Sequence, residues 1–349
     1  MRLLALLMMA ALPASAQVID AITPIGQVTL PHLMQYKNTP VGGLSGLTYD
    51  AKTDQFYAIS DDRSDRAPAR FYAFKVALKD GHLASVTPTG EWPLTVNGKP
   101  YGEDKIDSEG IAIAGDTLFV SSEGDVRAKL PPFVDGFSLT GQRTEQLPIP
   151  TPFQIGPQHG IRNNLAFETL TTSPDKKWLY TATESALLQD GPDGTAQKGA
   201  SSRILVYSLK SHKPVHQYRY DIDPAVKGRG TMIGVSDMVA LDNNGHLLAI
   251  ERSYSHASGN RLRLYEVDLH GATDISGVDS IKNMVNIKPA QKHLVADFAK
   301  LKLPLDNGEG IAIGPALADG SRLLLMVSDD NFSRYQHTYF WAFKIKLAH

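Results

Sequence analysis

The chain contains no cysteine among its 349 residues, so disulfide bonds cannot stabilise its fold. It has no apolar run long enough to form a membrane-spanning helix. Neither sign of charge dominates, because 35 basic and 37 acidic residues leave a formal net charge of −2. This balance gives no reason to expect nucleic acid or a membrane surface as a partner. The 11 histidines include no His-Glu-x-x-His spacing, so a zinc protease has no support.

The first residues are typical of a secretory signal peptide. Arg2 precedes an apolar run over residues 3–12, and Ala14-Ser15-Ala16 follows as a cleavage site of small residues. The run is too short to cross a bilayer. We therefore expect residues 1–16 to be removed and residues 17–349 to form one domain, a monomer in the periplasm or outside the cell. The alternative is that the apolar run is a buried N-terminal strand.

One structural unit recurs five times along the chain. Each unit has a short apolar run, a turn rich in Asp, Asn or Gly, and a second apolar run that ends near an acidic residue. Such paired runs predict β-hairpins. A third β-forming run follows in most units, as at residues 204–209, and a fourth follows in the first four, as at residues 215–222. The first runs begin near Ser45, Glu109, Glu168, Asp237 and Glu309.

Four strands per unit, repeated around a ring, predict an all-β fold with a single β-propeller of five four-stranded blades. The last unit lacks a fourth strand, and we expect residues 27–36 to supply it and close the ring. The loops at 97–107, 150–163 and 189–202 leave room for a sixth, degenerate blade. A β-sandwich with long loops is the alternative, but it does not account for a signature that recurs every ~60–70 residues.

Acidic residues hold two fixed positions in the unit. Because the two runs form antiparallel neighbours, the start of the first lies beside the end of the second. The acids are therefore predicted to crowd one mouth of the channel. Those at the first position are Glu109, Glu168, Asp237 and Glu309, and those at the second are Asp61, Glu123, Glu184, Glu251 and Asp329.

Carboxylates held this close repel one another, so a cation is expected among them. Calcium suits a site made only of oxygen ligands, and two Asp-Asp doublets strengthen that expectation. The candidate metal ligands are Asp61, Asp62, Glu109, Glu309, Asp329 and Asp330. The alternative is that nearby arginines neutralise the ring through structural salt bridges.

Three motifs carry a resemblance to a known family: residues 107–112 (DSEGIA), 160–168 (GIRNNLAFE) and 307–312 (NGEGIA). With these motifs, the sequence resembles the bacterial "esterase-like activity of phytase" family from about residue 42 to residue 346. Thr169 departs from the family pattern, which tends to show Gly there. The resemblance implies a secreted hydrolase but assigns no catalytic residue. It is similar in outline to propeller phytases, which bind calcium through carboxylates at the channel mouth and phosphate through basic residues.

These observations favour metal-assisted hydrolysis of a phosphate ester, a small-molecule substrate. A bound cation would neutralise phosphate charge, arginines would clamp the phosphoryl oxygens, and a carboxylate would act as base. The candidate catalytic residues are Glu168, Glu109 and Arg162, and the candidate substrate-binding residues are Arg63, Arg252, Asn164 and His159. The alternatives are a non-catalytic binding or scaffold propeller and a calcium-dependent esterase or lactonase.

Two partial motifs are discounted. Residues 159–162 (HGIR) resemble part of the histidine acid phosphatase signature, but the leading Arg and the trailing Pro are missing. Ser45 is not the centre of a Gly-x-Ser-x-Gly turn, because Leu47 stands where the second Gly is needed. Neither motif supports a histidine or serine nucleophile.

Overall fold

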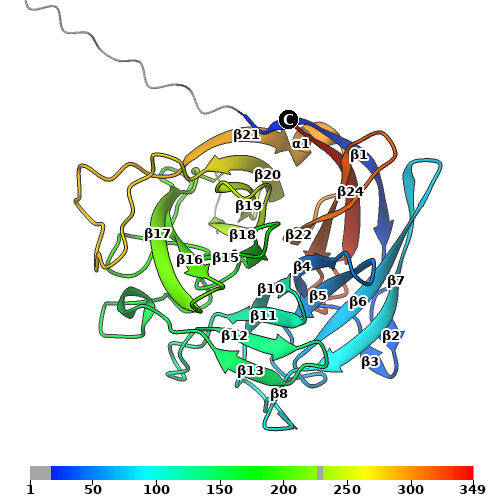
Figure 1. The fold of residues 1–349 in the computed structure, drawn as a ribbon, viewed down its shortest axis with the longest axis horizontal. Helices are drawn as coiled ribbons and strands as arrows, with labels where there is room; N and C mark the ends of the chain where they lie inside the picture. The colour runs from blue at the N-terminus through cyan, green and yellow to red at the C-terminus, as the bar shows by residue number, and fades with distance from the viewer. Residues whose placement is uncertain (1–16, 226–230, 349) are drawn as a thin grey trace, which may run out of the picture.

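Each predicted hairpin unit folds into a four-stranded antiparallel sheet, and five such sheets stand around a central channel (Figure 1). The computed structural model describes residues 17–225 and 231–348. The β-propeller with five four-stranded blades is therefore confirmed. The signal peptide predicted for residues 1–16 lies outside the described residues.

The strands of a blade follow one another from the channel outward. Blade one holds β4 (Leu44–Asp50), β5 (Gln55–Ser60), β6 (Arg70–Lys79) and β7 (His82–Pro93). Blade two holds β10 (Ser108–Ala114), β11 (Thr117–Ser122), β12 (Phe133–Ser138) and β13 (Arg143–Gln146). Blade three holds β14 (Thr171–Thr172), β15 (Trp178–Ala182), β16 (Ser201–Ser208) and β17 (Lys213–Asp221). Blade four holds β18 (Met232–Ala240), β19 (His246–Ser255), β20 (Gly259–Asp268) and β21 (Gln291–Asp297). Blade five holds β22 (Asn307–Ala316), β23 (Arg322–Asp329), β24 (Tyr339–Leu347) and β1 (Ile19–Thr29).

The loops that left room for a sixth blade contain none in the part of the chain that is described. They hold small elements instead: the second strand of the hairpin β8 (Thr95–Val96) and β9 (Lys99–Pro100), and the 3-10 turn η1 (Thr151–Phe153). The other small elements are the hairpin β2 (Gln35–Tyr36) and β3 (Thr39–Pro40) and the short helix α1 (Phe298–Leu301). No helix among the described residues is long and apolar enough to span a membrane.

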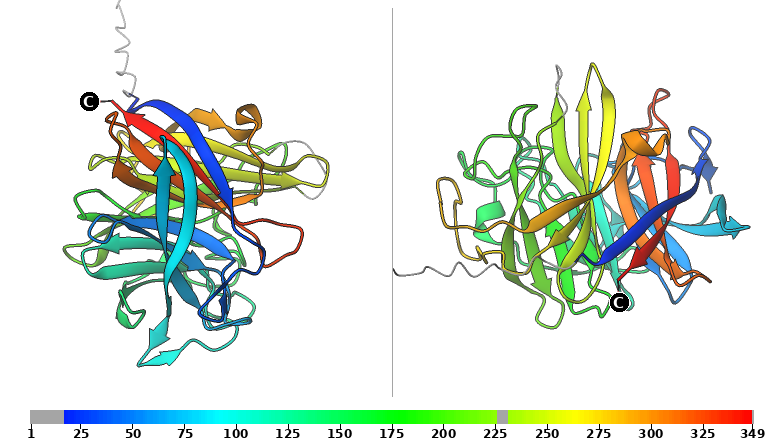
Figure 2. Two further views of the ribbon diagram at one scale, coloured as in Figure 1. Left: turned by 90° about the vertical axis from the view of Figure 1, so that its right-hand side faces the viewer. Right: turned by 90° about the horizontal axis from the view of Figure 1, so that it is seen from above.

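The N-terminal strand closes the last blade, as predicted, but its bounds differ from the prediction. In β1, Ile19 pairs with Leu347 and Thr29 pairs with Tyr339, so only the first three residues of the expected segment 27–36 lie in this strand. Figure 2 shows β1 running beside the C-terminal strand β24. Pro31 follows closely, and it cannot donate a backbone hydrogen bond to a continuing ladder. The strand therefore ends before residue 31.

The hydrophobic core lies between the blades, as five separate clusters of buried side chains. In β23, Leu323 and Leu325 pack toward blade one, whereas Leu324 and Met326 pack toward blade four. Successive side chains of a strand point to opposite faces, so a strand that is buried on both faces needs a continuous apolar run. This explains why the second run of each unit is apolar without alternation.

Candidate functional site

In four blades the innermost strand carries a β-bulge at the same place, and in blade three the equivalent extra residue precedes the short strand β14. In β22, Gly308 pairs with Ser328 and Gly310 pairs with Val327, so Glu309 is the extra residue. A bulge turns the extra side chain away from the regular alternation. The register gives the equivalent extra residues of the five blades in chain order as Ser45, Glu109, Glu168, Ser236 and Glu309. Four of these five residues line the channel mouth, and only Ser236 does not.

One residue at or just beyond the end of the second strand of each blade lies opposite the bulge. The backbone of this residue pairs with the residue two positions before the bulge, as between Asp61 and Gly43 or between Glu123 and Asp107. In blade four this partner of Gly234 is Arg252. The five equivalent residues are Asp61, Glu123, Glu184, Arg252 and Asp329. Blade four is therefore the exception, with a serine in the bulge and an arginine opposite it.

Two predicted members of the acidic ring, Asp237 and Glu251, each lie one residue away from the expected position. The carboxylate of Asp237 accepts hydrogen bonds from the backbone N–H of Met238 (2.8 Å) and of Ile311 (2.9 Å), in the channel wall. The carboxylate of Glu251 accepts a hydrogen bond from the Tyr220 hydroxyl at 2.7 Å, outside the pocket. Neither residue lines the mouth as predicted, because the strand register puts Ser236 in the bulge and Arg252 opposite it, and of these two only Arg252 lines the cavity.

Steric contact between neighbouring blades explains why a glycine follows the bulge in blades one and two. A Cβ added to Gly110 would lie 2.6 Å from Leu170 Cβ and 2.8 Å from the Leu170 backbone nitrogen. A Cβ on Gly46 would lie 2.6 Å from the Glu109 carbonyl oxygen. At Gly46 and Gly110 the innermost strand of the next blade thus approaches too closely for a side chain, whereas blades three and four carry Thr169 and Asp237 at this position. In the Glu-Gly-Ile motif of blade two, the Glu side chain lines the mouth and the Gly contacts the neighbouring blade.

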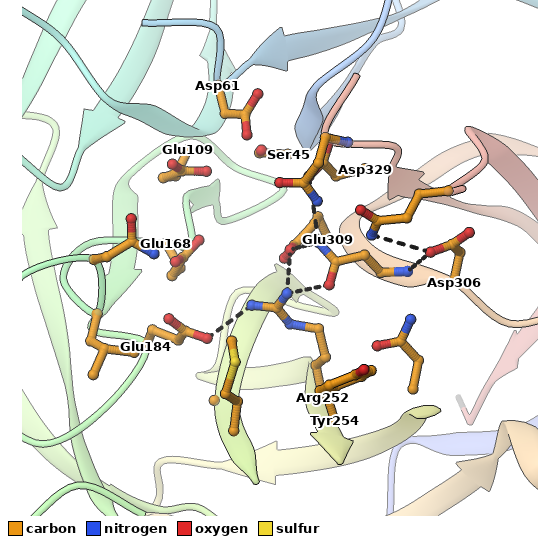
Figure 3. Close-up of a pocket in the computed structure, with 18 of the residues that line it drawn as sticks. Ser45, Asp61, Glu109, Glu168, Glu184, Arg252, Tyr254, Asp306, Glu309 and Asp329 are labelled. Atoms are coloured by element: carbon orange, nitrogen blue, oxygen red, sulfur yellow. Dashed lines mark hydrogen bonds and ion pairs between the residues drawn. The ribbon is translucent and has the colours of Figure 1, made fainter. Parts of the chain in front are cut away.

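The mouth opens into a cavity of about 800 Å³, in which the labelled acids point toward one another (Figure 3). Eight of the twelve predicted site residues line this cavity. They are Asp61, Arg63, Glu109, Asn164, Glu168, Arg252, Glu309 and Asp329. The sequence analysis predicted Glu184 as a ring member and placed Ser45 at the equivalent first position of its unit, and both line the cavity. It missed other lining residues, including Asp107, Tyr254, Asp306, Asn307 and Tyr335.

Two of the predicted metal ligands, Asp62 and Asp330, do not line the cavity. Asp62 forms a buried ion pair with Arg70, whose Nη1 lies 2.7 Å from Asp62 Oδ2. Asp330 Oδ1 accepts hydrogen bonds from the backbone N–H of Gly43 (3.0 Å) and of Phe332 (3.1 Å). Both carboxylates hold the loops around the mouth, so the structure separates them from the proposed metal ligands.

The predicted residues Arg162 and His159 also lie outside the cavity. Arg162 donates from Nε to the Ala186 carbonyl at 2.9 Å and from Nη2 to the Gly191 carbonyl at 2.6 Å. His159 Nε2 lies 2.7 Å from Asp279 Oδ1. Arg162 thus supports a loop, and neither side chain is placed to contact a ligand in the cavity.

Arg252 neutralises one side of the ring. Its Nη2 lies 2.9 Å from Glu184 Oε1 of blade three, and its Nη1 lies 2.7 Å from Glu309 Oε1 of blade five. Asn307 extends this network, because its amide nitrogen donates to Glu309 Oε1 at 2.7 Å and its amide oxygen accepts from Arg252. Burial alone would lower the pKa of Arg252, but Glu309 and Glu184 raise it above its ordinary value. We call Glu184, Arg252, Asn307, Glu309 and Asp329 the arginine half of the ring.

The remaining ring acids, Asp61, Glu109, Glu123 and Glu168, form what we call the acidic half. The nearby cation is Arg63, which is already bound to Asp107 through Nε at 2.7 Å. Two sets of carboxylates come together here, and in each set one oxygen per residue lies within 4.8 Å of the others. The sets are Asp107, Glu109 and Glu123, and Glu123, Glu168 and Glu184.

Burial, followed by repulsion between neighbouring carboxylates, raises the carboxyl pKa values of the acidic half well above the ordinary range. Burial also raises the pKa of Glu309 to about 8 and of Asp329 to about 7, although Arg252 opposes both shifts. The pKa of Asp107 rises to about 6 because burial outweighs the attraction of Arg63. Holding all these groups ionised at neutral pH therefore requires more positive charge than the two arginines provide.

The fold and this acidic mouth define a class of five-bladed propeller with a carboxylate-lined pocket. The family model for the phytase-like family, described as esterase-like activity of phytase, matches residues 39–332, so the chain belongs to that family. The resemblance noted in the sequence is thereby confirmed. No curated protein is a significant match to the chain.

Several solved structures resemble the chain distantly. One is a hydrazine synthase of Kuenenia stuttgartiensis, with 12% identity and a TM-score of 0.38, over 82% of this chain. The match spans 64% of the hydrazine synthase chain, less than two thirds of its length. A hypothetical protein from Leishmania major has 11% identity and a TM-score of 0.43, over 90% of each chain. The RS223 β-xylosidase has 12% identity and a TM-score of 0.45, over 88% of this chain and 92% of its own. None of these likenesses bears on function.

Proposed function

We propose that this protein is an exported hydrolase-like propeller whose channel-mouth pocket binds a divalent cation and hydrolyses a phosphate ester in a cation-dependent manner. One observation carries the proposal: the acidic half gathers four carboxylates beside an arginine that is already engaged by Asp107. An anionic ester would be repelled from this pocket unless a bound cation reversed its charge.

The residues present fit calcium. The carboxylates at the mouth offer only oxygen atoms as metal ligands, and calcium takes six to eight oxygen ligands in flexible geometry. Glu309 Oε2 is buried without a hydrogen-bond partner among the described residues, as expected of an oxygen that awaits a ligand. The carboxylates whose oxygens lie close enough to share the ion are Asp107, Glu109 and Glu123 in one set and Glu123, Glu168 and Glu184 in the other. Asp61, Glu309 and Asp329 line the same cavity and are the further candidate ligands. When bound, calcium supplies positive charge that offsets their repulsion and attracts a phosphoryl group.

The chain's own residues supply the contacts to the ester. Arg63 Nη2 donates to Asn164 Oδ1 at 3.0 Å, which leaves the Asn164 amide N–H₂ to donate to a substrate oxygen. Arg63 and Arg252 lie on the cavity wall and limit where an anionic group can sit. Glu109 and Glu168 are the candidate bases, because they line the cavity and form no ion pair with an arginine in the described chain. Burial and neighbouring carboxylates raise both pKa values well above the ordinary range, which makes either carboxylate a stronger base when it does not itself bind the ion.

A non-catalytic binding propeller is the second candidate. The observation that favours it is that Arg63 and Arg252 are both committed to carboxylates, so less of each guanidinium is free to clamp a phosphoryl group. In this alternative the pocket binds a cation, or a ligand through that cation, without turnover.

A substrate screen with calcium or chelator separates the candidates. The substrates are p-nitrophenyl phosphate, phytate and p-nitrophenyl acetate, and the test variant is Glu168→Gln. The matched control is Asp116→Asn, whose carboxylate is exposed on the opposite face and pairs with Lys52. Calcium-dependent phosphate release that is lost in Glu168→Gln but kept in Asp116→Asn supports the proposal. Calcium binding without turnover of any substrate favours the binding propeller, and turnover of the acyl ester alone favours an esterase.

A further inference from the structure

A second cluster of chemically active side chains lies at the far end of blade four, away from the acidic pocket. His246 begins β19, and its register partner Asp268 ends β20. His270 follows Asp268 by two residues, and Asp242 precedes His246 by four. Because β19 runs from His246 to Arg252 and beyond, this cluster lies on the opposite side of the propeller from the channel mouth.

Three of these residues present ligand atoms to a common point. His246 Nε2 lies 3.6 Å from Asp268 Oδ1, and His270 Nδ1 lies 2.6 Å from the same oxygen. One ligand atom from each of the three residues lies within 4.8 Å of the other two. Ligands at 2.0–2.2 Å from a tetrahedral metal ion lie about 3.4 Å from one another. The His270 Nδ1–Asp268 Oδ1 contact is shorter than this spacing, so metal binding requires the His270 ring, which is more than half exposed, to move away from Asp268.

The fourth residue fixes which nitrogen of His246 is available. His246 Nδ1 lies 2.7 Å from Asp242 Oδ2, and the backbone N–H groups of Asn244 (2.8 Å) and His246 (3.2 Å) hold Asp242 Oδ1 in place. The anionic carboxylate favours a proton on Nδ1, so the lone pair lies on Nε2, which faces Asp268. A carboxylate behind a histidine is the usual outer partner of a metal-binding imidazole.

We propose that His246, Asp268 and His270 form a binding site for a divalent transition-metal ion of the zinc class, with Asp242 as the residue that orients His246. Imidazole nitrogens select zinc, nickel or copper over calcium, so this site differs in chemistry from the oxygen-only pocket at the mouth. His270 also lines a small cavity of about 200 Å³ together with Trp178 and Tyr218.

Calorimetric titration of the tag-free full chain with Zn²⁺ tests the proposal. Excess calcium in the buffer competes with zinc for the carboxylate pocket, and the difference between the native chain and a histidine variant reports the histidine site. We expect one zinc per chain in the native protein and none at this site in His270→Ala, whose exposed side chain can be removed without loss of the fold. His212→Ala is the matched control, because His212 also contacts a carboxylate, that of Glu145, but belongs to no cluster of three ligands.

A second measurement separates the ligands from the residue that orients them. Asp242→Asn keeps all three ligands and should weaken zinc binding about 10–100-fold, as loss of an outer carboxylate does in other zinc sites. Cobalt absorption should report a tetrahedral nitrogen and oxygen site in the native chain and lose intensity in His246→Ala. The proposal is overturned if the native chain binds no zinc in calcium buffer, or if His270→Ala binds zinc with unchanged stoichiometry and affinity.

Discussion

The two halves of the channel mouth differ in the positive charge that lies beside their buried carboxylates. In the arginine half, blade four replaces the acid of the repeat with Arg252, which pairs with Glu184 and Glu309 of the two neighbouring blades. The acidic half gathers four carboxylates, and the arginine beside it is already bound to Asp107. The position that holds an acid in four blades holds an arginine in blade four, so the two halves of the mouth differ in fixed charge.

Removing the fixed cation should have the largest effect. Arg252→Met leaves Glu184 and Glu309 buried without their partner, which costs about 3–5 kcal/mol for a broken buried ion pair. Urea denaturation measures the loss. The control is Arg219→Met, which breaks the more exposed pair with Asp221 and should cost less than about 1 kcal/mol. Equal losses in the two variants would contradict the special place of Arg252.

Calcium should stabilise the protein through the acidic half. An ion that binds only where the folded blades bring the acids together would raise stability by about 2.7 kcal/mol at a hundredfold excess over its dissociation constant. Chelator should lower Tm, added calcium should restore it, and Glu109→Gln should blunt the response. An unchanged melting curve in chelator, with no metal in the purified protein, would show that the arginines neutralise the ring unaided.

The stability of the calcium-free protein should depend on pH. The pKa values of Asp107, Asp329 and Glu309 rise to about 6, 7 and 8 in the folded state, so the fold keeps protons that the unfolded chain releases. The stability that these groups contribute should therefore be greatest below about pH 4 and fall as the pH rises to about 8, by about 1.4 kcal/mol per pH unit for each net proton. Denaturation at several pH values measures the slope, and saturating calcium should flatten it. A slope that calcium leaves unchanged would place the titrating groups elsewhere.

Single neutralised acids should have opposite effects in the two halves. Glu168→Gln removes one of several repelling charges, so the calcium-free protein should gain about 1 kcal/mol. Glu309→Gln weakens the contact with Arg252 and should lose about 1 kcal/mol. Thermal melting of both variants in chelator gives the comparison, and shifts of the same sign would remove the distinction between the halves.

Much of this architecture could be predicted from the sequence, because hairpin periodicity and blade closure are properties of the local pattern. The single-residue shift at Asp237 and Glu251 could not, since a bulge changes the register without changing the spacing of acids. The doublets misled for a related reason: neighbouring residues of an extended chain point in different directions, so Asp61 and Asp329 face the cavity while Asp62 and Asp330 do not. The ion pairs of Arg63 and Arg252 with carboxylates join residues of different blades, and no local sequence pattern contains such contacts.

The pairing of β1 with β24 also determines when the ring can be completed. It joins strands from the two ends of the described chain, so this contact closes the longest loop in the molecule. Contacts of such long range form late and slow the folding of β-rich proteins. Until β1 docks, the β24 edge of blade five remains unpaired and Ile25 stays outside the core it shares with blade one. The N-terminal strand, made first during synthesis, must stay available until the last strand has emerged.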